Sequence, residues 1–426
     1  MNVFKIDTDI LKLADESQKS CEYIFKKIED IYEHNQIKIL SSFIKNKVCE
    51  SDFNGSTGYG YDDKGREKLD KVWADIFNSE DALVRHNFVS GTHAITVALF
   101  AILRPGELMV SITGNPYDTL KDVIGINRSN KIQGSLKEFG IKYDQVDLDS
   151  LGNINYNLVL KKCKEAKVVY IQRSRGYSFR KSISIKEIKK VVDIIKNENS
   201  NIIIIVDNCY GEFVEKIEPT DVGVDLIAGS LIKNPGGGIT KSGGYIAGRA
   251  DLIEFCGSRL TAPGLGKHVG CTLNELRDIF LGLYLSPQIT ANALKTAVFA
   301  SKFFENLGME VYPRFDEYRS DIVQTIKLSS KEGLIAFCRG IQKNSPIDSF
   351  LSPIPWDMPG YDSQIIMAAG TFTMGSSIEL SADAPLREPF AVWMQGALTY
   401  YTGKIGVISA AQELKDQVPR EFEGRV

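Results

Sequence analysis

The spacing of apolar positions changes along the chain. Between residues 8 and 48 they recur at helical intervals in a polar background, as at Ile24, Ile28 and Ile31, which predicts an N-terminal helical arm. From about residue 81 to residue 257, short apolar runs alternate with helical stretches, and the runs cover residues 82–89, 108–112, 141–146, 168–171, 202–206, 225–229 and 244–247. This alternation predicts an α/β domain with a mostly parallel central sheet.

The pattern after residue 270 indicates a second, smaller domain. Residues 274–306 have the spacing of long helices, with an interruption at Ser286–Pro287, and the segment from Met309 onward mixes short strands and helices. At 426 residues the chain is also longer than one hydrophobic core normally supports. We therefore predict three parts, which are a helical arm at residues 1–50, a large domain at 51–300 and a small C-terminal α/β domain at 301–426.

Composition and charge favour a small molecule over a macromolecule as the partner. The chain is 43% apolar and 25% charged with a formal net charge of -3, so we expect no surface for nucleic acid or an anionic membrane. No apolar run is long enough to span a membrane and the N-terminus lacks a signal-peptide pattern, which predicts a cytoplasmic protein. The seven cysteines form no CxxC pair and the four histidines have no zinc-ligand spacing, so we expect neither disulfides nor a metal site.

Polar residues that directly follow apolar runs are the first candidates for chemistry, because open α/β sheets bind ligands beyond the carboxyl ends of their strands. Ser90, Gly91 and Thr92, here called the anion turn, follow the first run and open a helical stretch. Such a turn offers backbone N–H groups and a hydroxyl to an anion such as phosphate, and an ordinary helix cap is the alternative. Tyr117, in the turn at residues 114–119, either packs in the core or stacks on a planar cofactor.

Two further candidates follow later runs. Asp207 ends the run at residues 202–206, where a carboxylate either pairs with a protonated ring nitrogen or caps a turn. Lys233 follows the run at residues 225–229 and enters a glycine-rich loop. A semi-buried lysine can lose its proton and form an imine, although most lysines are merely solvated. Lys241 is the second candidate for this role.

With these residues in this order, the sequence resembles the fold-type I pyridoxal-phosphate (PLP) enzymes, which have the aspartate-aminotransferase-like fold. The resemblance covers roughly residues 55–400 and points to the methionine gamma-lyase and cystathionine beta-lyase-like branch that includes the aluminium-resistance proteins. Four elements carry it: Ser90-Gly91-Thr92, Tyr117-Asp118-Thr119, Asp207-Asn208-Cys209-Tyr210 and Ser230-Leu231-Ile232-Lys233. It implies PLP as cofactor, a large domain with a mostly parallel central sheet and a smaller C-terminal α/β domain.

The resemblance also implies a role for each element. The anion turn would bind the phosphate of the cofactor, and Ser230 would bind the cofactor beside Lys233. Lys233 would carry PLP as a Schiff base and shuttle protons. Asp207 would keep the pyridine nitrogen protonated. Tyr117 would stack on the ring and could protonate a departing sulfur.

A tyrosine-containing segment resembles the part by which a neighbouring subunit reaches the phosphate in this family. It is Gly58-Tyr59-Gly60-Tyr61, so Tyr59 and Tyr61 are expected to bind the cofactor of a partner copy. The arginine that usually follows the tyrosine by two residues is absent here. The resemblance still implies a homodimer with shared active sites, and dimers that pair into a tetramer.

Two arginines compete for the substrate carboxylate, which needs a bidentate cation. Arg387 lies where the small domain of the family faces the site, and Arg175 follows the run at residues 168–171, where the cystathionine enzymes carry an Asn-Pro pair. For His93, the alternative to a role in the site is packing against the sheet. For Glu212 and Glu215, the alternative is a position on a solvated face.

The function implied is a carbon–sulfur lyase that acts on a sulfur amino acid of the cystathionine, methionine or cysteine type by β- or γ-elimination. Transamination or decarboxylation are other outcomes of the same cofactor chemistry, and a non-catalytic PLP-binding protein is the alternative from another class. A P-loop is excluded because Thr240 stands where the motif needs glycine before Lys241. A Rossmann dehydrogenase is excluded because the turn after the first run offers one glycine.

Overall fold

The chain forms two compact units in the computed structural model, which describes residues 4–126, 134–358 and 363–422. The large unit is Asn35–Tyr284, and the small unit combines Met1–His34 with Leu285–Val426. Both divisions fall inside continuous helices, α1 (Thr8–Lys45) and α8 (Leu276–Asn306). The predicted boundaries at 50 and 300 therefore differ from these divisions, because the apolar pattern of a long helix carries no mark where it leaves one core and enters another.

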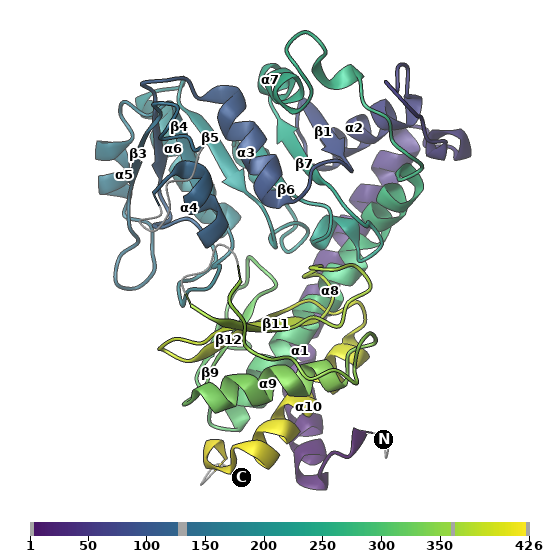
Figure 1. Cartoon of the computed structure of the whole chain (residues 1–426), viewed down its shortest axis with the longest axis vertical. Helices are drawn as coiled ribbons and strands as arrows, with labels where there is room; N and C mark the ends of the chain where they lie inside the picture. Colours follow the sequence, from purple (N-terminus) through teal and green to yellow (C-terminus); the bar gives the residue numbers. More distant parts are fainter. Residues whose placement is uncertain (1–3, 127–133, 359–362, 423–426) are drawn as a thin grey trace. The chain divides into compact units, whose positions relative to one another are not determined.

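A seven-stranded sheet forms the centre of the large unit among the described residues (Figure 1). Its order is β1-β7-β6-β5-β4-β2-β3; the pairings from β3 through β6 are parallel, and β7 pairs antiparallel with both β6 and β1. The predicted mostly parallel sheet is confirmed, with one strand for each apolar run: β1 (Asp81–Arg85), β2 (Leu108–Ser111), β3 (Lys142–Gln145), β4 (Val168–Gln172), β5 (Ile203–Asp207), β6 (Leu226–Ser230) and β7 (Gly244–Gly248). The first strand is shorter than the apolar run at residues 82–89, because the chain turns directly after Arg85.

Helices cover both faces of this sheet, and alternate strand residues divide between two cores. On β4, Val169 and Ile171 pack into the core that contains residues of α2 (Lys64–Ile76), α5 (Tyr156–Lys162) and α6 (Ile185–Glu198). Val168 and Tyr170 pack into the core of α3 (Gly91–Ile102), α4 (Asp118–Ile124) and α7 (Ala250–Leu260). Burial on both faces explains why the parallel strands are nearly continuous apolar runs.

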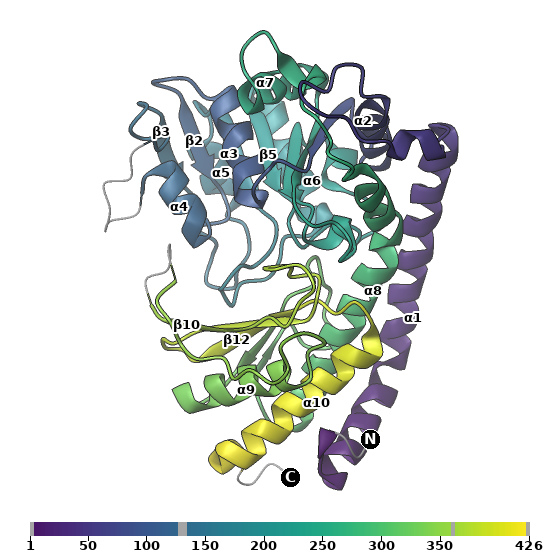
Figure 2. The ribbon, with the colours of Figure 1, turned by 45° about the vertical axis from the view of Figure 1, so that its right-hand side comes forward.

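The small unit is built on an antiparallel sheet of order β10-β11-β12-β9-β8. Figure 2 shows α9 and α10 side by side against this sheet, where their apolar residues share one core with the strands. The elements are β8 (Val311–Tyr312), β9 (Gln324–Lys327), α9 (Lys331–Lys343), β10 (Ile365–Ala368), β11 (Ser381–Pro385), β12 (Ala391–Gln395) and α10 (Tyr400–Gln417).

Helix α8 continues through Pro287, where the sequence predicted an interruption. A proline inside a helix removes one backbone donor, yet residues on both sides of Pro287, such as Leu283 and Ala291, are buried in the described structure. Burial of the flanking turns outweighs the local cost. No helix among the described residues combines the length and apolarity needed to cross a membrane.

Removing the Phe77 ring should destabilise the large unit strongly. Phe77 is fully buried and contacts the rings of Trp73, Phe213 and Tyr245 at centroid distances of 5.6, 5.6 and 5.5 Å. We expect Phe77→Ala to lower the free energy of unfolding by about 3–5 kcal/mol through lost packing and a residual cavity. Urea denaturation followed by circular dichroism measures this. Phe255→Ala is the matched control, since that ring is 50% exposed, and an equal loss in both variants would contradict the assigned core.

Candidate active site

Three strands of the large sheet end at the same edge with polar residues. Gln172 ends β4, Asp207 ends β5 and Ser230 ends β6, and Gln172 is the register partner of Asp207. All three are buried. Parallel pairing therefore gathers, from segments far apart in the sequence, polar groups at the carboxyl edge where open α/β sheets bind ligands.

The anion turn lies against the end of β6. Ser90 caps α3, and its hydroxyl accepts a hydrogen bond from the His93 N–H at 3.2 Å. Gly91 packs closely against both segments, since a Cβ atom there would lie 3.2 Å from both the Cys209 Sγ and the Ser230 Cβ. The start of a helix carries unpaired N–H groups and partial positive charge, so the anion turn favours binding of an anion.

His93 has a structural place beside the anion turn. Its Nδ1 accepts a hydrogen bond from the Val89 N–H at 3.1 Å, and its ring meets Phe88 edge to face. Burial lowers the pKa of His93, which favours the neutral ring. The packing alternative considered for this residue agrees with these contacts.

Tyr117 connects the anion turn to the end of β4. Its hydroxyl donates to the Thr92 Oγ1 at 3.0 Å, and its backbone N–H donates to the Gln172 Oε1 at 3.0 Å. Burial, and then the charge of Asp207, raises the pKa of Tyr117 well above its usual value. The phenol therefore keeps its proton at neutral pH. Gln172 was missed in the sequence, although it follows an apolar run just as Asp207 does.

Asp207 is 4% exposed and accepts two hydrogen bonds. One carboxylate oxygen accepts from the Cys209 N–H at 3.1 Å and the other from the Tyr170 hydroxyl at 3.3 Å. Burial raises the pKa of Asp207, and the positive charge of Lys233 opposes that effect. The charge of Lys233 and the hydrogen bonds from Cys209 and Tyr170 thus favour the ionised carboxylate against the effect of burial.

Lys233 follows the end of β6, and its side chain extends to the ring of Tyr210. Its Nζ lies 3.7 Å from the centroid of the Tyr210 ring. Burial alone would lower the pKa of Lys233, but Tyr210, Cys209 and Asp207 together raise it. Tyr210 has a positive φ of 70°, a backbone conformation uncommon outside glycine.

Lys241, the second lysine candidate, points to a different partner. Its ammonium forms ion pairs with Asp278 at 2.8 Å and Glu275 at 3.5 Å, and its side chain is 63% exposed. Lys241 is thus exposed and paired with acids at the start of α8, whereas Lys233 lies at the carboxyl edge of the sheet beside Asp207 and Tyr210. The geometry therefore favours Lys233.

Arg173, which the sequence did not single out, forms a buried polar network directly behind the site. Its guanidinium is fully buried and donates to the Asn208 Oδ1 at 2.7 Å, the Gly211 carbonyl at 2.9 Å and the Glu215 carboxylate at 2.9 Å. Glu218 lies 3.5 Å from the same group. This network anchors the loop at residues 208–218, which begins at the end of β5.

Glu212 and Glu215 are buried rather than on the solvated face considered as their alternative. Glu215 pairs with Arg173, and Glu212 accepts a hydrogen bond from the Tyr245 hydroxyl at 2.8 Å. The local sequence gives no sign of this burial, because the partners come from β7 and from the turn after β4.

Of the other predicted site residues, Arg175, Tyr59 and Tyr61 belong to the large unit and Arg387 belongs to the small unit. Arg175 is buried in the turn after β4, and its carbonyl accepts from the Ser178 hydroxyl at 2.6 Å. Arg387 is exposed after β11 in the small unit. Tyr59 and Tyr61 stack on each other at 5.4 Å and are 70% and 65% exposed.

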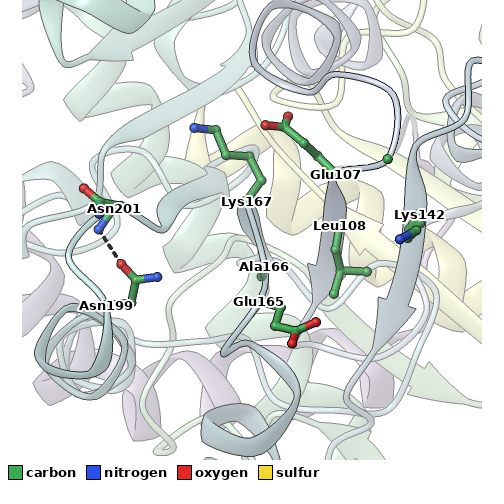
Figure 3. Close-up of a pocket in the computed structure, with 9 residues that line it drawn as sticks. Glu107, Leu108, Lys142, Glu165, Ala166, Lys167, Asn199 and Asn201 are labelled. Carbon is green, nitrogen blue, oxygen red and sulfur yellow. Dashed lines mark hydrogen bonds between the residues drawn. The ribbon is translucent and has the colours of Figure 1, made fainter.

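A separate groove of about 340 Å³ lies at the opposite, amino-terminal edge of the sheet (Figure 3). It is lined by side chains at the starts of β2, β3 and β4 and by the connection into β5: Glu107, Leu108, Lys142, Glu165, Ala166, Lys167, Asn199 and Asn201, together with Gly106. Its acidic and basic groups are mixed and half-buried or exposed. It contains none of the predicted site residues.

The profile of the methionine gamma-lyase family matches residues 10–415. The chain belongs to the methionine gamma-lyase family.

Several known proteins are similar to this chain over nearly its whole length. The crystal structure of a carbon-sulfur lyase involved in aluminium resistance from Clostridium novyi NT is 50% identical, with a TM-score of 0.93 and coverage of 97% of each chain. The uncharacterized protein YnbB of Bacillus subtilis is 48% identical over 404 residues, which are 95% of this chain and 96% of YnbB. The PLP-dependent protein YhfS of Escherichia coli, at 15% identity and a TM-score of 0.61, covers 91% of this chain and shares the fold. The predicted fold-type I architecture is confirmed, and the methionine gamma-lyase family implies PLP as cofactor.

Glu212 should make the stability of the folded chain depend on pH. Burial raises the pKa of Glu212 from the usual 4.5 to about 8. The folded state therefore holds a proton that the unfolded state has lost, so this stabilising contribution is complete below pH 4.5 and is lost as pH rises toward 8. Glu212→Gln cannot ionise and should escape this loss.

Urea denaturation from pH 5 to pH 8 measures the effect. We expect the free energy of unfolding of Glu212→Gln, relative to wild type, to increase steadily with pH over this interval. Glu254→Gln, at an exposed position on α7, is the control and should show no such trend. A difference between Glu212→Gln and wild type that is constant with pH would contradict the raised pKa.

Proposed function

We propose that this chain is a PLP-dependent carbon–sulfur lyase that cleaves a sulfur-containing amino acid by β- or γ-elimination. The observation that carries the proposal is the convergence of the anion turn, Tyr117, Asp207 and Lys233 at the carboxyl edge of one sheet. Membership of the methionine gamma-lyase family supports the same chemistry.

The residues at this edge fit pyridoxal phosphate. The anion turn offers N–H groups and hydroxyls at the start of α3, and the absence of a side chain at Gly91 brings that start against Ser230. Asp207, buried beside Lys233, is placed to hold a cationic ring nitrogen. Lys233 would bind the aldehyde carbon covalently through its Nζ.

When bound, PLP supplies an electron-accepting ring that stabilises negative charge at the substrate Cα. Lys233 would take the proton from the substrate Cα through its Nζ. Tyr117 keeps its phenolic proton, held toward Thr92, and that proton is available to a departing thiolate. Asp207 fixes the charge of the ring nitrogen throughout.

The substrate carboxylate would be bound by Arg387 or Arg175. Arg387 is exposed, so its guanidinium is available for a bidentate carboxylate. Arg175 is 3% exposed and already interacts with other groups of the protein. This difference favours Arg387.

We further propose a homodimer with shared sites, in which Tyr59 and Tyr61 reach the cofactor of the partner. Arg66 supports their segment, since its buried guanidinium donates to the carbonyls of Gly60 and Gly270, both at 2.7 Å. Two stacked aromatic rings that are mostly exposed on a firmly held loop suit an intermolecular contact. Pairing of such dimers into a tetramer belongs to the same proposal.

The central test uses absorbance and product release. Wild-type protein with PLP should show the visible band of lysine-bound cofactor, and one of L-cystathionine, L-methionine or L-cysteine should shift that band and yield keto acid, ammonia and a thiol, or hydrogen sulfide in the case of L-cysteine. Lys233→Ala should lose the band and all turnover while remaining folded, whereas Lys241→Ala should retain both. Retention of the band in Lys233→Ala would move the assignment to Lys241.

Three outcomes of this test would reject the PLP-dependent lyase. A band that none of the amino acids perturbs would favour a non-catalytic PLP-binding protein. Amino-group transfer without thiol release would favour an aminotransferase. Absence of the band after addition of PLP to wild-type protein would reject the cofactor.

Shared sites predict complementation between two inactive variants. Lys233→Ala retains the tyrosines, and the double variant Tyr59→Ala/Tyr61→Ala retains the lysine. In a random mixture, half of the dimers are mixed and each has one complete site, so co-expression should restore about a quarter of wild-type turnover. The control is a mixture of the two variants, which are expressed separately and combined under conditions in which subunits do not exchange. No recovery in co-expressed, purified dimers would contradict the shared site.

A further inference from the structure

Tyr170 connects the middle of β4 to the carboxylate at the end of β5. Its register partner is Ile205, two positions before Asp207, and both Tyr170 and Ile205 pack into the core of α3, α4 and α7. Because alternate residues of a strand share a face, Asp207 has the same orientation as Ile205. The Tyr170 hydroxyl donates to the Asp207 Oδ2 at 3.3 Å, and both residues are buried.

Packing alone does not require a phenol at this position. Tyr170 is fully buried among apolar residues of the sheet and its helices, where a phenylalanine ring would fill nearly the same volume. A buried hydroxyl needs a hydrogen-bond partner, and the Asp207 carboxylate is the acceptor that satisfies it. The hydroxyl of Tyr170 therefore serves Asp207 rather than the core.

Each oxygen of Asp207 has a donor from the protein. The Cys209 N–H binds Oδ1 at 3.1 Å, and the Tyr170 hydroxyl binds Oδ2. A carboxylate oxygen has two lone pairs, so each can accept one further hydrogen bond. Donors stabilise the ionised form of a carboxylate and so weaken it as a base. Burial, and then the charge of Asp207, raises the pKa of Tyr170 well above its usual value, so the phenol keeps the proton that it donates.

The titratable groups around Asp207 come from four elements. Lys233 after β6 supplies a positive charge that lowers the pKa of Asp207 against the effect of burial. Tyr117 before α4, Tyr170 on β4 and Cys209 after β5 are neutral at neutral pH, because burial raises the pKa of each. In the proposed function the Lys233 nitrogen binds the cofactor, so its charge toward Asp207 changes. The hydrogen bonds from Tyr170 and Cys209 are the contributions that do not depend on this change.

We propose that Tyr170 is a positioning residue that keeps Asp207 a weak base, so that the proton between Asp207 and the ring nitrogen of PLP stays on the nitrogen. The inference rests on the proposed function, in which Asp207 pairs with that nitrogen. Transfer of the proton to Asp207 would leave a neutral acid beside a neutral pyridine, and the pair gains or loses no other atom or electron. A protonated ring accepts electrons better, so Tyr170 acts on the chemistry through Asp207.

The test is the nitrogen-15 NMR signal of the full chain loaded with PLP that is labelled at its ring nitrogen. Free labelled PLP in acid and in base supplies the reference positions of the protonated and unprotonated nitrogen. At neutral pH, wild-type protein should give a signal near the protonated position. Tyr170→Phe removes the hydroxyl and keeps the ring, so the proton equilibrium should move about ten-fold toward Asp207 and the signal should move toward the unprotonated position.

Tyr245→Phe is the matched control for loss of a buried phenol from the same sheet. Tyr245 on β7 is fully buried, and its hydroxyl donates to a different carboxylate, that of Glu212, at 2.8 Å. The nitrogen signal of this variant should coincide with that of wild type.

Each outcome decides between explanations. A Tyr170→Phe signal equal to that of wild type overturns the inference, and so does an equal displacement in Tyr245→Phe, which would indicate general loosening of the sheet. If Tyr170→Phe did not fold, Tyr170→Met, which also lacks a donor, takes its place under the same criterion. Failure of the proposed function has a different signature, because wild-type protein would then give no signal of bound PLP. A bound but unprotonated nitrogen in wild type would overturn the inference while leaving the cofactor in place.

Discussion

The site depends on a carboxylate buried at the end of a strand. Asp207 is 4% exposed, and burial of a charge costs several kcal/mol unless hydrogen bonds and an opposite charge compensate. The Cys209 N–H and the Tyr170 hydroxyl supply the hydrogen bonds, and Lys233 supplies the charge. A cationic ring nitrogen beside Asp207 would take over this compensation, which leaves Lys233 able to give up its own charge when it binds the cofactor. One buried acid thus couples ligand binding to the reactivity of the lysine.

The Arg173 network holds the backbone that this arrangement needs. Tyr210 and Phe213 have positive φ values of 70° and 61°, and such residues cost roughly 1–3 kcal/mol each. Between and beside them, Arg173 binds the Gly211 carbonyl and the side chains of Asn208 and Glu215. These bonds fix a strained loop so that the Tyr210 ring faces the Lys233 ammonium. The network therefore acts on the site through backbone geometry, without contact to a reacting group.

The sheet could be predicted because the signal for each strand lies in the strand's own sequence. Each parallel strand is buried on both faces, so that β5 reads as isoleucine and valine up to Asp207, and the position of a polar residue after such a run marks the ligand edge. The polar network could not be predicted, since Arg173 meets Glu215 and Glu218 only after β4 and β5 have paired. The segment around Glu212 and Glu215 has the composition of a surface loop, and only long-range pairing reveals that it is buried. The divisions inside α1 and α8 could not be predicted for a related reason. A helix that packs into two cores has the same spacing of apolar residues along its whole length.

Glu212 differs from Asp207 in how its burial is compensated. For Asp207 the largest effect that opposes burial is the charge of Lys233, whereas for Glu212 hydrogen bonds come first and Lys233 last. Asp207 therefore has an opposite charge that compensates its burial, whereas burial leaves Glu212 protonated at neutral pH.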